Sequence, residues 1–374
     1  MARRRADGSV LSAPHEGRRR GVLLVAATGA LLATLVVLEL LLRATVVPFR
    51  LPPPPAPRTL DPYEANPFVV RARPLLQTFL PGSRYRAARA GYDVEYAINA
   101  HGFRGPEVGD KHRPRLLLVG DSIAEGHGVP FESALPSLLG KALDGDGWDV
   151  VNAAMQGGSP VHYAANVERY LALEPDAVVL LLYENDLWDD RAREAAYADL
   201  PLLDDDAPLQ LLVVAKRAWR NLSPTPLEQR ILANRDLVPE QPVDARFPWI
   251  LSEAEVDRQF RASTPYLDAF ATALAAHDVP LLVAFVAIGA LVPAGQPLFG
   301  EHARALEDDV GEWAAAQGSP FLSLCPLVTQ AFASPGGGDV MIAGDGHPTI
   351  GMQRRLADAM APWLRANLPP AKHG

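Results

Sequence analysis

Short apolar runs alternate with segments of helical spacing from residue 115 onward, and this alternation limits the possible folds more than any other feature. The runs expected to form strands are residues 115–120, 148–154, 176–183 and 279–288, with a short strand in 320–325 and a strand or hairpin in 92–105. The segments expected to form helices are residues 131–143, 161–173, 253–277, 300–317 and 350–367. Pro265 is expected to kink or split the third of these helices. Strands that alternate with helices favour an α/β fold, in which a parallel sheet is covered on both faces.

The N-terminal part of the chain has a different pattern. Residues 21–42 (GVLLVAATGALLATLVVLELLL) contain one ionisable residue, Glu39, and a helix of this length can cross the ~30 Å core of a bilayer. The arginines that precede this run are Arg3, Arg4, Arg5, Arg18, Arg19 and Arg20. We therefore expect residues 1–20 to form a basic cytoplasmic tail and residues 21–42 to form a single-pass anchor of the cytoplasmic membrane, with the remainder of the chain outside. A cleaved signal peptide and a buried helix of a soluble protein are the alternatives.

Two further segments divide the rest of the chain. Residues 43–80 contain four consecutive prolines at 52–55, a pattern typical of a stiff, extended linker. Residues 81–370 are expected to form one globular domain. Inside that domain the alternation of strands and helices stops at 187–252, which we interpret as an inserted lid or cap.

Composition excludes several classes of protein. The chain has 374 residues and a net charge of −9, and no basic stripe with interleaved aromatic residues supports binding to nucleic acid. Cys325 is the only cysteine, so the chain can form neither an internal disulfide nor a cysteine-based metal site, and we expect this residue to be buried. The scattered histidines, His127 among them, lack metal-ligand spacing and are expected to have ordinary structural roles. We expect no metal and no cofactor.

Polar or small residues follow three of the expected strands, where an open α/β sheet builds its ligand site. Ser122 in GDS could be a nucleophile if a base reaches it, or it could only cap the next helix while Asp121 braces the turn. Gly157 follows the second strand, where a glycine lets a backbone N–H approach a substrate oxygen closely. Asn185 follows the third strand, where its amide could donate a hydrogen bond to the same oxygen.

A candidate base lies near the C-terminus, in the stretch AGDGHP before the last expected helix. His347 is suited to general-base chemistry near neutral pH, and a carboxylate such as Asp345 can fix the tautomer of its ring. In an extended loop these two side chains would point the same way. A serine, two oxyanion donors, an acid and a base together predict an acyl-transfer site.

These motifs resemble the four blocks of the SGNH (GDSL-type) hydrolases, over residues 113–366. Ser122 in GDS, Gly157 in NAAMQGG, Asn185 in ND and His347 in DGHP match the blocks, and INAHGFRGPE resembles the segment before the first block in membrane-anchored bacterial members. The resemblance implies a flavodoxin-like three-layer α/β/α fold. It also implies that Ser122 attacks esters, that His347 is the base, and that Ser122 N–H, Gly157 N–H and the Asn185 side chain form the oxyanion hole.

The chain departs from the family pattern at two positions. Tyr183 stands where the third block usually has glycine, which is expected to reshape the wall of the pocket. Gly344 stands where the family has its acid, so Asp345 is the expected acid, with a Ser-His dyad as the alternative. Asp186 is expected to brace the loop of Asn185, and Arg104 to be structural rather than a clamp on the substrate.

Three functions are compatible with the sequence. The first is a membrane-anchored, extracytoplasmic serine esterase that removes acyl groups, in particular acetyl groups, from a glycan or lipid. The second is an O-acetyltransferase on a cell-envelope polysaccharide, which would use the same serine and a partner membrane protein as acyl donor. The third is a non-catalytic module that binds glycan.

Overall fold

The computed structural model describes most of the chain outside the predicted lid. The described residues are 14–45, 59–60, 69–73, 76–89, 91–186, 253–287, 301–334, 339–343 and 345–370. The predicted lid at 187–252 lies outside them. Two compact units are present, residues 1–52 with 204–224 and residues 53–203 with 225–374, and we describe each by itself.

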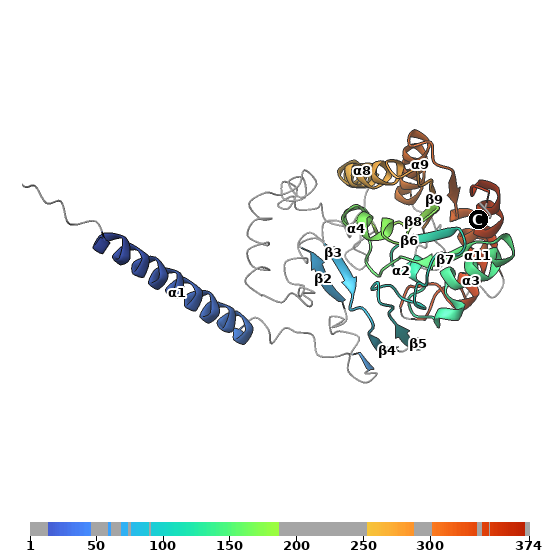
Figure 1. Ribbon diagram of the computed structural model, residues 1–374. Helices are drawn as coiled ribbons and strands as arrows, with labels where there is room; N and C mark the ends of the chain where they lie inside the picture. Colours follow the sequence, from blue (N-terminus) through green and yellow to red (C-terminus); the bar gives the residue numbers. More distant parts are fainter. Residues whose placement is uncertain are drawn as a thin grey trace, which may run out of the picture. The chain divides into compact units, whose positions relative to one another are not determined.

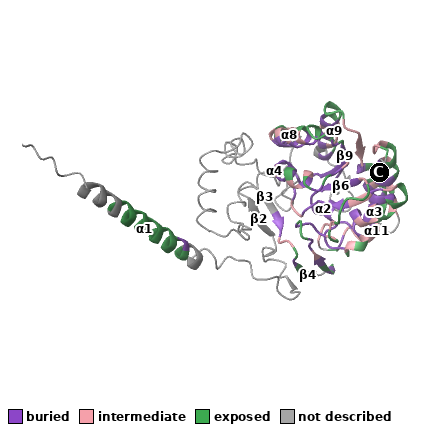
Figure 2. Cartoon of the chain, in the orientation of Figure 1, coloured by how far each residue is buried: buried purple, intermediate pink, exposed green. Residues whose placement is uncertain are grey.

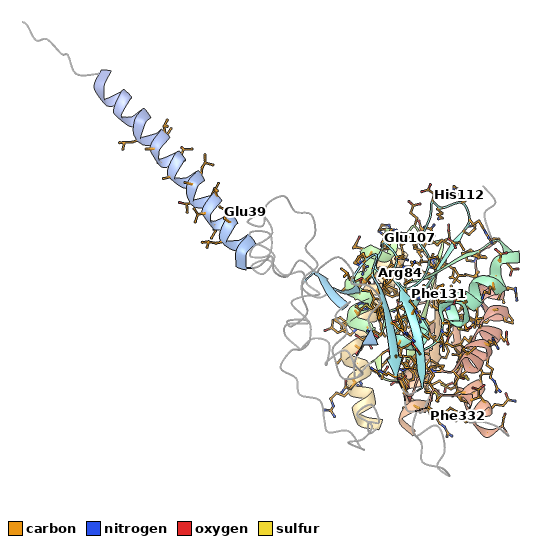
Figure 3. All side chains as sticks on the ribbon, turned by 90° about the horizontal axis from the view of Figure 1, so that it is seen from below. Glu39, Arg84, Glu107, His112, Phe131 and Phe332 are labelled. Atoms are coloured by element: carbon orange, nitrogen blue, oxygen red, sulfur yellow. The ribbon has the colours of Figure 1, made fainter. Side chains whose placement is uncertain are left out.

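The described part of the first unit is the long helix α1 (Pro14–Thr45). Its segment Leu23–Leu41 has a mean hydropathy of 2.3, and almost all of its side chains are exposed (Figure 2). Glu39 is the exception, with 8% of its surface exposed (Figure 3). By length and composition, α1 can be a membrane anchor or a signal sequence.

A five-stranded parallel sheet forms the centre of the second unit (Figure 1). Its strands are β6 (Arg115–Gly120), β7 (Asp149–Asn152), β8 (Ala177–Tyr183), β9 (Leu281–Val286) and β10 (Phe321–Ser323). Their order across the sheet is β10-β9-β8-β6-β7, and every neighbouring pair is parallel. This is the flavodoxin-like order, in which the chain reverses its direction across the sheet beside the first strand, here β6. The predicted fold class is confirmed.

Alternate residues of the central strands face opposite layers of helices. Leu117 and Val119 of β6 lie in an apolar cluster with one set of helices, whereas Leu116 and Leu118 lie in a second cluster with the other set. The first layer consists of α4 (Pro160–Leu171), α8 (Glu253–Ala275) and α9 (Glu301–Ala316). The second layer contains α3 (Leu135–Leu143), α10 (Cys325–Ala333) and α11 (Ile350–Asn367). The three central strands β6, β8 and β9 are buried throughout, which explains their continuous apolar sequences, whereas the edge strands β7 and β10 are only partly buried (Figure 2).

Three helices differ from the sequence prediction. The predicted helix 131–143 is divided into a 3-10 turn, η2 (Phe131–Ser133), and α3, because Ala134 between them is extended. Helix α8 continues through Pro265 as one helix. Helix α10 was not predicted. Pro326 cannot donate to a strand ladder, so the short strand β10 ends before it, and proline fits the first turn of the helix that follows.

Small sheets precede the central one. They contain β1 (Thr59–Leu60), β2 (Val69–Arg73), β3 (Leu76–Phe79), β4 (Arg84–Arg89) and β5 (Tyr92–Ala97). The first three strands fall inside the range 43–80 that was expected to be a linker, and Phe79 at its end is fully buried. The folded part of the chain therefore begins before residue 81.

The β4–β5 hairpin brings a third apolar cluster to the sheet edge that carries the candidate site. Alternate residues of the hairpin, including Tyr85, Tyr92 and Tyr96, face inward and pack with Met155 and Ile342. Met155 follows β7 and Ile342 precedes Asp345, so the hairpin lies against two loops that hold predicted site residues.

Candidate active site

The turn that carries Ser122 is formed by close packing at the end of β6. A Cβ atom on Gly120 would lie 2.6 Å from the Leu181 carbonyl oxygen, so only glycine fits between the two central strands. Asp121 caps the short helix α2 (Ser122–Glu125), and its Oδ1 accepts a hydrogen bond of 2.8 Å from Ile123 N. Ser122 thus begins α2 at the carboxyl end of β6, where an open α/β sheet binds its ligands, and 8% of its surface is exposed.

His347 lies within hydrogen-bonding distance of Ser122. The distance from His347 Nε2 to Ser122 Oγ is 2.9 Å, and His347 Nδ1 bonds to Asp345 Oδ1. Ser122 Oγ also lies 3.3 Å from Asp121 Oδ2, a longer contact. The serine, the histidine and the aspartate therefore form a continuous hydrogen-bonded chain.

A tight turn, rather than the expected extended loop, brings Asp345 and His347 together. Ile342 N donates to His347 O at 2.8 Å, and Asp345 N donates to Ile342 O at 3.1 Å. Gly346 lies between these two predicted site residues with a φ of +88°, a conformation that glycine adopts without strain. The turn folds Asp345 back onto the imidazole ring.

The environment of Asp345 favours its charged form. Burial acts to raise the pKa of Asp345, but the hydrogen bond with His347 and the charges of His347, His127 and Arg89 outweigh burial and lower this pKa. Arg89 Nη1 lies 3.3 Å from Asp345 Oδ2. A carboxylate can accept a hydrogen bond from a protonated Nδ1, and in that tautomer of His347 the Nε2 lone pair faces Ser122 Oγ.

The loop of Gly157 is attached to the Ser122 turn. Met155 N donates to Gly120 O at 3.0 Å, and Gln156 N donates to Glu125 Oε2 at 2.6 Å. Gly157 follows these anchors with a φ of +63°. The loop after β7 is thus fixed against both ends of the short serine helix.

Asn185 follows β8 in a loop that Asp186 holds. Asp186 Oδ2 accepts hydrogen bonds from Tyr163 OH at 3.0 Å and from Tyr183 N at 3.2 Å. Asn185 Oδ1 is buried and has no hydrogen-bond partner among the residues that the structure describes. Tyr183 is 6% exposed and packs in the second apolar cluster, so its side chain belongs to the core rather than to an open pocket wall.

His127 is a site residue that the sequence analysis missed. Its ring centroid lies 4.4 Å from that of His347, and its ring nitrogens are hydrogen-bonded to Tyr92 OH and Tyr96 OH. No spacing rule pointed to it, because its partners come from distant segments of the chain. The only available signal was its place five residues after Ser122, in the same glycine-rich turn.

Three of these residues form a cluster of possible metal ligands. Ligand atoms of His127, Asp345 and His347 lie within 4.8 Å of one another. All four ring nitrogens of the two histidines already have hydrogen-bond partners among the described residues. The arrangement therefore suits proton transfer better than metal binding.

Glu125, at the end of α2, is the second residue that was missed. Its Oε2 accepts the hydrogen bond from Gln156 N, whereas no described residue is a hydrogen-bond partner of its Oε1. Burial raises the pKa of Glu125 to about 7, against the opposing effect of the Arg104 charge. Arg104 itself is 1% exposed and donates to the carbonyl oxygens of Gly126 and Val129, in agreement with the structural role expected for it.

The fold and the site define an α/β serine hydrolase, because a serine–histidine–aspartate chain lies at the carboxyl edge of a parallel sheet. The family model described as GDSL-like Lipase/Acylhydrolase family matches residues 118–355. The chain belongs to this family, and it is a serine hydrolase that acts on esters.

The chain is also similar to the solved structures of several other proteins. TesA is 21% identical, with 68% of this chain and 99% of that chain covered and a TM-score of 0.40. The acetyl xylan esterase AlAXEase is 14% identical, and the match covers 67% of this chain and 99% of the esterase with a TM-score of 0.40. The lipase/acylhydrolase from Enterococcus faecalis is 14% identical, with 69% and 98% covered and a TM-score of 0.38. A comparison with curated proteins gave no match.

Proposed function

We propose that this chain is a membrane-anchored, extracytoplasmic esterase that removes small acyl groups, in particular acetyl, from a glycan or lipid. Ser122 is the nucleophile, His347 is the general base, and Asp345 orients His347. The observation that carries this proposal is the 2.9 Å contact between Ser122 Oγ and His347 Nε2, which the hydrogen bond from His347 to Asp345 extends.

The reaction proceeds in two acyl transfers. Ser122 Oγ forms a bond to the ester carbonyl carbon while its proton passes to His347 Nε2, and the carbonyl electron pair moves onto oxygen. When the carbonyl re-forms, the bond to the leaving alkoxide breaks, and His347 gives its proton to that oxygen. Water then attacks the acyl-serine with the help of His347, which releases the acid and regenerates Ser122.

We assign the oxyanion hole to Ser122 N–H, Gly157 N–H and the Asn185 amide. All three follow carboxyl ends of neighbouring strands. The anchors on either side of these loops support this assignment, because stabilisation of a developing charge depends on donors that are fixed before the reaction.

The size of the acyl group and the location of the site complete the proposal. A small acyl group suits Ser122, since only 8% of this residue is exposed. The basic residues before the apolar run favour an N-terminus inside the cell and a catalytic unit outside it, where acylated envelope glycans and lipids are found.

The test is esterase activity of the full chain in detergent micelles on nitrophenyl esters from acetate to octanoate. We expect the acetate to be preferred and activity to be lost in Ser122→Ala and in His347→Ala, whereas Ser319→Ala and the exposed His277→Ala retain it. Activity in either of the first two variants would contradict the assigned roles. An added oligosaccharide distinguishes the acceptors, because accelerated acyl transfer to the sugar would identify an O-acyltransferase instead of a hydrolase.

A further inference from the structure

The β4–β5 hairpin lies before residue 118, where the match to the family begins, yet it contacts the predicted catalytic pair. Its outward face is polar, with Arg84 of β4 bonded to Glu95 of β5 at 3.2 Å (Figure 3). Its inward face is aromatic and packs with Ile342, three residues before Asp345. A Cβ on Gly91, at the hairpin turn, would lie 2.6 Å from Ala343 O, so the hairpin and the loop of the acid are in close contact.

The first contact between the hairpin and the catalytic pair is ionic. Arg89, at the end of β4, donates from Nη1 to Asp345 Oδ2 at 3.3 Å, while the other carboxylate oxygen bonds to His347. The Asp345 side chain is only 3% exposed, whereas 44% of the Arg89 side chain is exposed. The carboxylate is therefore held from both sides in a nearly buried position.

The second contact passes through His127. Tyr92 OH lies 3.0 Å from His127 Nε2, and Tyr96 OH lies 3.1 Å from His127 Nδ1. Tyr96 OH also accepts a hydrogen bond of 3.1 Å from Gly128 N. Both nitrogens of the ring are thus fixed by hydroxyls of the hairpin, and the His127 ring lies against His347 at a 44° angle.

The environment keeps His127 neutral. Burial lowers the pKa of His127 well below its usual value, and a charge on His347 lowers it further. Burial also raises the pKa of Tyr92 to about 12, so this hydroxyl keeps its proton. A neutral ring held in this way packs against His347 without competing for the proton that catalysis moves.

We propose that the β4–β5 hairpin is the positioning element of the catalytic pair, with Arg89 orienting Asp345 and His127 orienting His347. Neither residue contacts the reacting atoms, so both are positioning residues. The inference rests on the proposed function, because it assumes that His347 is the base.

Other charged or titratable groups also surround the pair of histidines. They are Arg89, Tyr92 and Tyr96 from the hairpin, Arg104 from the turn after it, Asp121 and Glu125 from the serine turn, and Asp345. A test must therefore change one of them while the rest stay in place.

The first test compares Arg89→Met with Arg86→Met in the full chain in detergent micelles. Both residues lie on β4, but Arg86 pairs with Asp93 and does not contact Asp345. Arg89 bonds to the Asp345 oxygen that does not contact His347, so its loss should free the carboxylate to shift and lower kcat roughly 3-fold to 10-fold, with KM within a factor of two. Arg89→Lys keeps the charge and should restore part of the lost kcat, whereas Arg86→Met should keep the wild-type kcat. Equal kcat for Arg89→Met and Arg86→Met would overturn the role of Arg89.

The second test compares His127→Phe with Val328→Ala, a variant of a buried residue of α10 in the second apolar cluster. Phenylalanine keeps a ring at this position but forms no hydrogen bond with the tyrosines. We expect kcat of His127→Phe to fall roughly 10-fold to 100-fold with KM within a factor of two, since a small displacement of a reacting group is costly. Val328→Ala should lower the melting temperature with kcat retained.

A folded His127→Phe protein with wild-type kcat would overturn the role of His127. If His127→Phe does not fold, Tyr92→Phe removes only one hydroxyl that bonds to His127. An unchanged kcat of Tyr92→Phe would then overturn the role of His127. The rate of labelling by a fluorophosphonate should fall together with kcat. If Ser122→Ala or His347→Ala stays active, the proposed function itself fails. If only the hairpin variants behave like wild type, this inference alone fails.

Discussion

Asn185 shows, at the scale of a single residue, how a loop can present an amide to a reaction site. Asp186 fixes the loop around Asn185 through a hydrogen bond from Tyr183 N. Asn185 Oδ1 is buried and has no hydrogen-bond partner among the described residues. An oxyanion is itself an acceptor and cannot bond to Oδ1, so the proposed role belongs to Nδ2 of the same amide, which would donate to the developing charge.

Asn185→Ala is therefore expected to lower kcat by about 100-fold to 1,000-fold, as the loss of one oxyanion donor usually does. KM and the melting temperature should stay close to wild type, because the side chain makes no hydrogen bond to the core through Oδ1. Steady-state kinetics on nitrophenyl acetate and thermal unfolding measure both quantities. Turnover equal to wild type would remove Asn185 from the oxyanion hole.

Glu125 leads to a prediction about pH and stability. Its pKa is about 7 in the folded protein and about 4.5 when the chain unfolds, so between these values the folded protein holds a proton that the unfolded chain has released. The stability associated with this proton is present below pH 4.5 and is lost as pH rises through 7. The shift corresponds to about 3 kcal/mol.

Glu125→Gln keeps an acceptor for Gln156 N but does not titrate. Relative to this variant, the wild-type free energy of unfolding should decrease by roughly 2 to 3 kcal/mol between pH 5 and pH 8.5. Urea unfolding at the two pH values measures the difference, and the exposed Glu132→Gln serves as the control. A constant difference across this range would show that Glu125 is not buried as described.

At the scale of elements, the position of Ser122 depends on how closely β6 approaches β8. A Cβ on Gly120 would lie 2.6 Å from Leu181 O and 2.7 Å from Ala124 Cβ, so an added methyl group must displace either a strand or α2. Gly145, in the turn after α3, has no neighbour within 4 Å of an added Cβ. Gly145 therefore provides the control position for a substitution at Gly120.

Gly120→Ala is expected to lower the free energy of unfolding by roughly 1 to 3 kcal/mol, the usual cost of overpacking. Activity per folded molecule should also fall, since α2 carries the nucleophile. Gly145→Ala should stay within about 0.5 kcal/mol of wild type, as exposed substitutions usually do. Unfolding by urea and nitrophenyl acetate hydrolysis measure these effects, and equal behaviour of the two variants would contradict the packing argument.

At the scale of the whole molecule, the proposed location of the enzyme depends on whether the apolar helix α1 is a membrane anchor or a signal sequence. If α1 is an uncleaved anchor, the full-length chain should remain with membranes after an alkaline carbonate wash, and only detergent should release it. A phosphatase that folds only outside the cytoplasm, fused to the C-terminus of the chain, should be active, because the proposal places the catalytic unit outside the cell. A soluble chain shortened at its N-terminus would instead identify the helix as a cleaved signal sequence.

The sequence by itself determined the α/β fold class, the helices with strong periodicity and the family resemblance, and the flavodoxin-like order came only as what that resemblance implies. Those features are local, because a buried parallel strand is a continuous apolar run and Gly-Asp-Ser is a contiguous motif. Helix α11 was predicted with its observed bounds, Ile350–Asn367, since its apolar residues repeat with helical period over five turns. Helix α10 was missed because its nine residues give too short a pattern.

Only the tertiary structure decided which residues surround the histidine. His127, Arg89 and Tyr92 lie hundreds of residues from His347 along the chain, and no local pattern connects them. The turn that brings Asp345 to His347 likewise depends on backbone hydrogen bonds that Ile342 donates to His347 and accepts from Asp345, which a sequence does not display. The sequence therefore supplied the candidate residues, whereas packing between distant segments decided their geometry, because side-chain contacts across a fold are set by the relative placement of whole elements.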